Sequence, residues 1–191
     1  MNVSTSQDAL ERRAWADAHE PPIGPEMARH YLRDLVYGAI DGIITTFAVV
    51  AGVAGANLAA STAIILGIAN LVADGFSMGA SNFLGIRSEE AALAAQGEPH
   101  REPFPLRHAL ATFLAFIFAG SLPLLPFVIA PPVDRFALAA ATTLAALFAV
   151  GALRSLVTNL RWWWAGMEML TVGAIAALFS YGLGFVIARF T

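Results

Sequence analysis

The sequence has no cysteine and no lysine among its 191 residues, and only 13% of its residues are charged. The absence of cysteine excludes a disulfide framework, a thiolate metal site and a cysteine nucleophile. Soluble domains carry about 25% charged residues. The scarcity of charge, together with a hydrophobic fraction of 58%, is therefore typical of a membrane protein. The net charge of −3 is small and predicts no nucleic-acid partner.

Five apolar segments are long enough to cross a bilayer, whose hydrocarbon core of about 30 Å takes roughly 20 helical residues. They are Leu35–Gly55, Ser61–Leu84, His108–Ala130, Phe136–Val157 and Ala165–Phe190. The longest connection between them is residues 85–107. The sequence therefore predicts an all-α integral membrane protein, with one five-helix transmembrane domain over residues 35–190 and a polar N-terminal tail over residues 1–34.

The distribution of arginine predicts the orientation in the membrane. With the N-terminus in the cytosol, nine arginines fall on the inner side and only Arg135 and Arg189 on the outer side. Cytoplasmic segments carry an excess of basic residues, so we expect a cytoplasmic tail and, after five spans, an outside C-terminus. The tail lacks the pattern of a cleaved signal peptide. Together with the use of arginine alone and the frequent alanine, this favours the inner (plasma) membrane of a bacterium.

Polar side chains interrupt the second span in the stretch NLVADGFSMGASN. Asn70, Asp74 and Met78 follow one another at four-residue intervals and so share one face of a helix. Asp34 lies just before the first span and Asp41 lies within it. They are seven residues apart and so also share one face of a helix. A carboxylate at the bilayer centre costs at least ~2.5–3.5 kcal/mol, so such groups face a bundle interior or a water-filled path.

The polar stripe has a structural and a functional interpretation. Asp41 and Asp74 could be protonated groups hydrogen-bonded between helices, and Asn70 could bond across a helix pair, as small polar residues often do in membranes. Met78 alone would be packing. On the face that carries Asp74, however, its thioether is a plausible ligand for a softer transition metal rather than for Mg²⁺ or Ca²⁺.

Two motifs in the first two spans, DGIITTFAVVAGVAGA and GIANLVADGFSMGASNFLG, resemble the vacuolar iron transporter family, and GALRSLVTNLRWWWAGMEMLTVGAIAALFSYGLG fits its last two helices. The resemblance implies a five-helix homodimer that moves Fe²⁺, and often Mn²⁺, out of the cytosol in exchange for protons. The metal would be the substrate, with no further cofactor. By position, Asp41 matches the membrane-embedded aspartate of the family, Met78 its metal-binding methionine, and Asp34 an acidic residue nearer the cytosolic entrance.

The sequence departs from the family pattern at two places. Iron-carrying members often have Glu where this chain has Asn70, and Asp74 one turn later is a candidate replacement. Well-known members also insert a Glu-rich, helical metal-binding domain between the second and third helices. Residues 85–107 are too few to build such a domain. We expect a short cytoplasmic loop in its place.

Within this connection, Glu89 and Glu90 are expected to form a solvated helix end. His100 and His108 are expected to form no dedicated metal site, because no paired histidine spacing is present. The sequence thus predicts a transporter rather than an enzyme. The alternative is a non-transporting scaffold or sensor protein that retains the fold, which the missing domain and Asn70 both favour.

Glycine and proline motifs predict how the helices pack. GAIDG in the first span and GFSMG in the second place glycines four residues apart, which lets two helices approach closely, either at a dimer seam or along a pore wall. Pro123 and Pro126 predict a kink in the third span, because a proline lacks the amide hydrogen of a regular helix. Glu168, near the start of the last span, is expected to pair with Arg161 or to line the cytosolic entrance.

Overall fold

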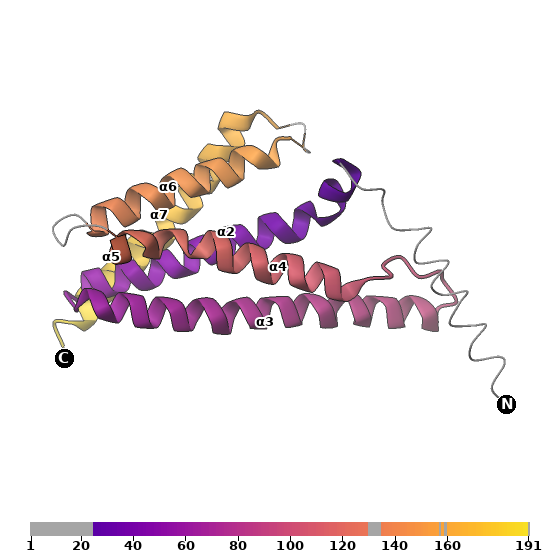
Figure 1. The fold of residues 1–191 in the computed structure, drawn as a ribbon, viewed down its shortest axis with the longest axis horizontal. Coiled ribbons are helices and arrows are strands. Elements are labelled where there is room, and N and C mark those ends of the chain that lie inside the picture. Colours follow the sequence, from indigo (N-terminus) through magenta and orange to yellow (C-terminus); the bar gives the residue numbers. More distant parts are fainter. Residues whose placement is uncertain (1–24, 130–134, 157, 159, 191) are drawn as a thin grey trace.

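The computed structural model describes residues 25–129, 135–156, 158 and 160–190, and the regular secondary structure of these residues is all helical. The elements in chain order are α2 (Pro25–Gly55), α3 (Ala60–Ala95), α4 (Pro105–Gly120), the 3₁₀ turn η1 (Leu122–Leu124), α5 (Leu125–Ile129), α6 (Arg135–Arg154) and α7 (Trp162–Ile187). Figure 1 shows them as a bundle of long rods joined by short connections.

Five helical segments among the described residues are long and apolar enough to cross a membrane, which confirms the predicted number of spans. Four of them lie within α2, α3, α6 and α7, and the third combines α4, η1 and α5 as Pro105–Ile129. The protein is therefore a multi-pass integral membrane protein. Most of the predicted tail, residues 1–24, lies outside the described residues.

Two helices extend beyond their predicted ends. The described part of α2 already includes Pro25, ten residues before Leu35. α3 continues past Leu84 to Ala95, and the chain reverses only near Gly97, whose φ of 72° suits glycine. At about 1.5 Å per residue, α3 is about 54 Å long, roughly 24 Å longer than a hydrocarbon core. Its C-terminal part therefore extends out of the apolar layer.

α2 lies at the centre of the bundle and packs against α3, α4, α6 and α7. In Figure 1, α3 and α4 run side by side and α6 pairs with α7, with α2 between the two pairs. Ile43 and Val50 of α2 are completely buried, as is Phe116 of α4. Val50 and Phe116 belong to one apolar core cluster, and Ile43 belongs to a second cluster with Leu147 and Met169. The start of α2 and the α3–α4 connection meet at the same end of the bundle, hereafter the loop end.

The glycine motifs pack inside one subunit. A Cβ added at Gly38 or Gly42 of α2 would collide with backbone carbonyl oxygens of α4, and one added at Gly79 of α3 would lie 3.0 Å from the carbonyl oxygen of Ala109. Both motifs therefore let α2 and α3 approach α4 closely. This confirms the predicted close helix contacts, with α4 as the common partner.

The third span is broken where the prolines predicted a kink. α4 ends at Gly120, the 3₁₀ turn η1 contains Pro123, and α5 resumes the helix with Pro126 in its first turn. Both proline side chains are buried. The break lies at the opposite end of the span from the loop end and leaves the start of α4 a regular helix.

Candidate functional site

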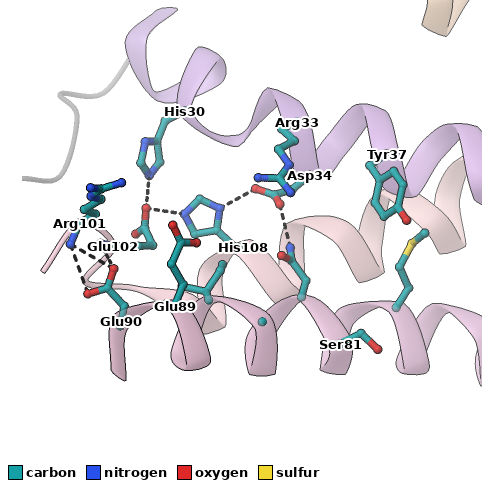
Figure 2. Close-up of a pocket in the computed structure, with 14 residues that line it drawn as sticks. His30, Arg33, Asp34, Tyr37, Ser81, Glu89, Glu90, Arg101, Glu102 and His108 are labelled. Carbon is teal, nitrogen blue, oxygen red and sulfur yellow. Dashed lines mark hydrogen bonds and ion pairs between the residues drawn. The ribbon is translucent and has the colours of Figure 1, made fainter. Parts of the chain in front are cut away.

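A cavity of about 720 Å³ opens between α2, α3, α4 and the α3–α4 connection at the loop end. Figure 2 shows polar and charged side chains lining it from each of these elements. Along α3 the lining extends from Glu90 to Met78, which is about 18 Å of helix axis at 1.5 Å per residue. The cavity thus reaches from the surface connection to the polar stripe of the second span.

Asp34 is buried beside this cavity and is held by partners on two other helices. Its Oδ2 lies 2.5 Å from Nδ1 of His108, and its Oδ1 accepts a hydrogen bond of 2.7 Å from the side-chain amide of Asn82. The same amide lies 2.8 Å from Oγ1 of Thr112, which in turn donates to the carbonyl oxygen of His108. A buried charge is tolerated where such contacts compensate its desolvation. Asp34 therefore joins α2, α3 and α4 at the cavity wall.

The predicted stripe on α3 lies partly in the cavity. Met78 is half-buried and lines it together with Asp34. Asp74 and Asn70 are also half-buried, and they lie one and two turns further from the loop end, respectively. The amide nitrogen of Asn70 is buried without a hydrogen-bond partner among the described residues. The structure thus brings Met78 and Asp34 to one cavity and leaves an amide of the stripe unsatisfied within the single chain.

Asp41 lies in a different hollow. It lines a second cavity of about 420 Å³ with Tyr37 and Arg154, on the side of α2 that faces α6. Its carboxylate interacts electrostatically with that of Asp74 on α3. Asp41 and Met78, paired by the family resemblance, are therefore not lining residues of one cavity within a single chain.

The prediction for Glu168 needs correction. Its carboxylate forms an ion pair of 2.5 Å with Arg154 of α6, rather than with Arg161. Because Arg154 also borders the hollow that contains Asp41, the pair fixes α7 to α6 beside this second cavity.

The sequence analysis missed the polar contacts of the α3–α4 connection. Glu90 is buried rather than solvated, and it accepts hydrogen bonds from the backbone N–H groups of Arg101 and Glu102 and contacts Nδ1 of His100 at 2.8 Å. Only Glu89 is exposed as predicted. Glu90 therefore holds the connection against the end of α3.

The proximity of His108 to a second histidine was not predicted from the sequence. The rings of His30 and His108 have centroids 4.9 Å apart, and Glu102 lies within 3.1 Å of a nitrogen of each. His30 and His108 are 78 positions apart in the sequence, so no spacing rule links them. The signal available was that His30, in the predicted tail, and His108, at the start of a predicted span, both fall on the predicted cytoplasmic side.

Named relatives match the chain over different lengths. It is 24% identical to vacuolar iron transporter 1 of Arabidopsis thaliana, with 97% of this chain and 99% of that protein covered. It is 26% identical to the vacuolar iron transporter of Centaurea cyanus over 80% of this chain and 86% of that protein. It is 39% identical to the vacuolar iron transporter of Toxoplasma gondii over 35% of this chain, which is 22% of that protein.

The alignment with the Arabidopsis protein spans 248 positions although this chain has 191 residues, so the two chains differ by substantial insertions. The sequence model of the VIT family matches residues 32–104 and 94–185 of this chain. The matched region begins in α2, includes the residues that line the cavity except His30, and ends in α7. The chain belongs to the VIT family.

Proposed function

We propose that the protein exports a divalent transition metal, Fe²⁺ or Mn²⁺, from the cytosol by exchange with protons. Full-length relatives named vacuolar iron transporters support the substrate class. The observation that carries the proposal is the cavity at the loop end, where the carboxylate of Asp34 and the thioether of Met78 line one space that reaches into a membrane bundle. Oxygen and sulfur ligands together suit a transition metal better than Mg²⁺ or Ca²⁺.

The arginine bias supports a cytosolic loop end. A hydrated ion enters the cavity from this end, where Asp34 attracts it. Met78 and Asp74 on α3, together with Asp41 on α2, then replace part of its water shell. Protonation of Asp41 or Asp74 from the far side releases the ion, because one carboxylate oxygen cannot bind a proton and a metal at once. Asn70 serves as a neutral ligand on the same stripe.

A second copy of the chain completes the site. In the single chain Asp74 is only half-buried and Ser77 is exposed, although both lie at membrane depth on α3. Lipid tails provide no hydrogen-bond partners, so polar groups on a span are covered by protein or border water. A homodimer that covers this stripe would shield Asp74 and Ser77 from the lipid tails.

The test is a flux assay with purified protein in proteoliposomes, using Fe²⁺ under anaerobic conditions and Mn²⁺ at several pH gradients. We expect metal flux that increases with the opposing proton gradient and a loss of at least tenfold for Met78→Ala. Met167→Ala is the matched control, since this methionine is exposed on α7 and lines neither cavity described above.

Each part of the proposal can fail separately. Equal flux at every pH gradient would show that transport does not exchange protons. Equal flux in Met78→Ala and in the Met167→Ala control would show that Met78 is not part of the ion path. Absence of flux for every ion in a folded protein refutes transport and favours the scaffold or sensor alternative.

A further inference from the structure

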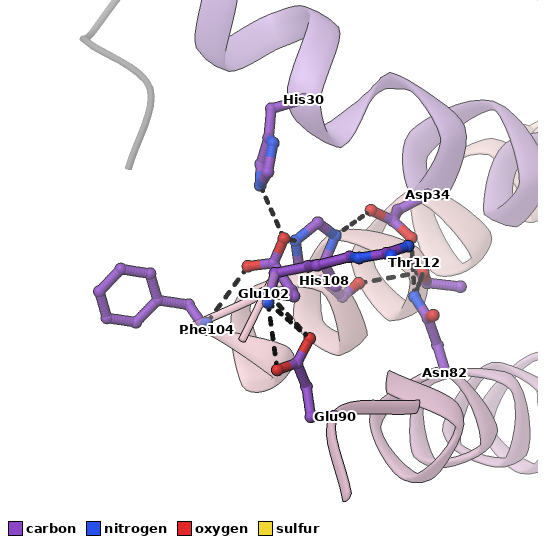
Figure 3. Close-up of polar contacts among 9 residues, drawn as sticks. His30, Asp34, Asn82, Glu90, Glu102, Phe104, His108 and Thr112 are labelled. Atoms are coloured by element: carbon purple, nitrogen blue, oxygen red, sulfur yellow. Dashed lines mark hydrogen bonds and ion pairs between the residues drawn. The ribbon is translucent and has the colours of Figure 1, made fainter. Parts of the chain in front are cut away.

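Three side chains from separate segments meet at the loop end of the cavity. They are His30 of α2, His108 in the first turn of α4, and Glu102 of the α3–α4 connection. Glu102 Oε2 lies 3.1 Å from Nε2 of His30 and 3.0 Å from Nε2 of His108. One ligand atom from each residue lies within 4.8 Å of the other two. Figure 3 shows the two imidazoles converging on this carboxylate.

His108 is oriented as a histidine ligand would be. Its side chain is 9% exposed, and its Nδ1 faces the carboxylate of Asp34 at 2.5 Å. Metal-binding histidines usually donate their second N–H to a carboxylate, which fixes the ring and raises its basicity. Its Nε2 is buried and close to Glu102, yet it makes no hydrogen bond of acceptable geometry with any described residue. The nitrogen that a metal would bind is thus unsatisfied and directed toward the other two side chains.

Glu102 is positioned by contacts that leave one of its oxygens for the imidazoles. Its backbone N–H donates to Glu90 Oε1 at 2.9 Å, which fixes the connection against α3. Its Oε1 accepts a hydrogen bond of 3.2 Å from the backbone N–H of Phe104. Its Oε2 then faces both histidines. The fold therefore places the carboxylate before any ligand arrives.

We propose that His30, His108 and Glu102 bind a divalent transition metal ion at the mouth of the cavity, with Asp34 as the positioning residue of His108. Two imidazoles and one carboxylate form a donor set that proteins use for Fe²⁺ with open positions, and imidazole also suits Zn²⁺ and Ni²⁺. Tetrahedral ligands at about 2.0–2.1 Å from a metal lie about 3.3 Å from one another. The present separations of 3.0 and 3.1 Å from Glu102 would change by only a few tenths of an ångström.

The position of this site gives it a role upstream of the membrane path. The three ligands line the same cavity as Met78, so an ion that leaves them has a continuous space toward the polar stripe. This role as a loading site rests on the proposed function, whereas metal binding itself does not. The site would let this short chain bind metal ions with residues from α2, α4 and the nine-residue connection, residues 96–104.

The experiment measures Co²⁺ binding to the full-length protein in detergent, with X-ray absorption spectroscopy to count imidazole ligands on the bound ion. We expect one Co²⁺ with two imidazoles. His30→Gln and His108→Gln should each weaken this binding at least tenfold and reduce the imidazole count. His100→Gln is the matched control, because it removes an exposed histidine of the same connection that is not one of the three ligands.

Folding and the membrane path are controlled separately. The His30 side chain is partly exposed, so its replacement should not disturb folding. His30→Gln therefore tests metal binding even if His108→Gln does not fold. Met78→Ala should keep the imidazole-bound Co²⁺ even if it abolishes flux, which separates this site from the proposed transport. Asp34→Asn should weaken binding by about 10- to 100-fold while two imidazoles remain bound, as expected for a residue that acts through His108. Bound Co²⁺ without imidazole, or an imidazole count unchanged by His30→Gln, would overturn the proposal.

Discussion

Removal of the Glu90 carboxylate should release the α3–α4 connection from α3. The carboxylate accepts backbone hydrogen bonds from Arg101 at 3.1 and 3.2 Å and from Glu102 at 2.9 Å. A hydrogen bond to a charged group contributes about 1.5–3 kcal/mol. Because water can replace part of each bond at the protein surface, we take the lower value for each of the two donors. Glu90→Ala should then lower the local stability of the connection by about 3 kcal/mol.

Hydrogen exchange of the amides at positions 101 and 102 measures this loss directly. Since about 1.4 kcal/mol corresponds to a factor of ten in an equilibrium constant, the two amides should exchange roughly a hundredfold faster in Glu90→Ala. Glu89→Ala is the control, because it removes the same charge from the exposed neighbouring position. Exchange within threefold of the wild-type rate at both amides would refute the argument that Glu90 anchors the connection.

Two further substitutions test the packing around the cavity. Gly42→Ala should destabilise the protein by about 1–3 kcal/mol, because a Cβ there meets the backbone of α4. Thermal unfolding in detergent measures this loss. Gly182→Ala is the control and should show no such loss, because its added Cβ meets nothing within 4 Å. Asn82→Ala should cost about 1–3 kcal/mol by leaving Asp34 Oδ1 without its amide donor. Ser81→Ala, at the exposed neighbouring position, should unfold at the wild-type temperature, and an equal loss in both variants would contradict the role given to Asn82.

Apolar length and helical periodicity predicted the main features of the fold. The five spans follow from hydropathy, and the break in the third span follows from Pro123 and Pro126. α3 extends past the predicted span because hydropathy marks where a helix leaves the apolar layer, whereas backbone signals decide where it ends. No proline lies between Leu84 and Gly97, so the helix continues into the polar region.

The candidate site was predictable only where its residues share one helix. Asp74 and Met78 lie on one face because their spacing matches the helical repeat. The cluster of His30, Glu102 and His108 could not be found in this way, because it depends on three segments that meet only in space. The burial of Glu90 likewise requires the connection to fold back over the end of α3.

The residues expected to bind metal within the membrane also show how far a family resemblance extends. It paired Asp41 with Met78, while the structure places them along different hollows of a single chain. Asp41 and Asp74 nevertheless lie near enough for their carboxylates to repel each other, a proximity of the first two spans that no helical spacing could reveal.

The most direct test of the account is anaerobic Fe²⁺ flux into proteoliposomes that contain either the wild-type chain or the variant carrying both Asp41→Ala and Met78→Ala. The proposed path predicts flux in the wild type and flux at the protein-free level in the double variant, with both proteins incorporated in equal amounts and folded. Wild-type flux in the double variant would contradict the central claim that the ion passes through these residues.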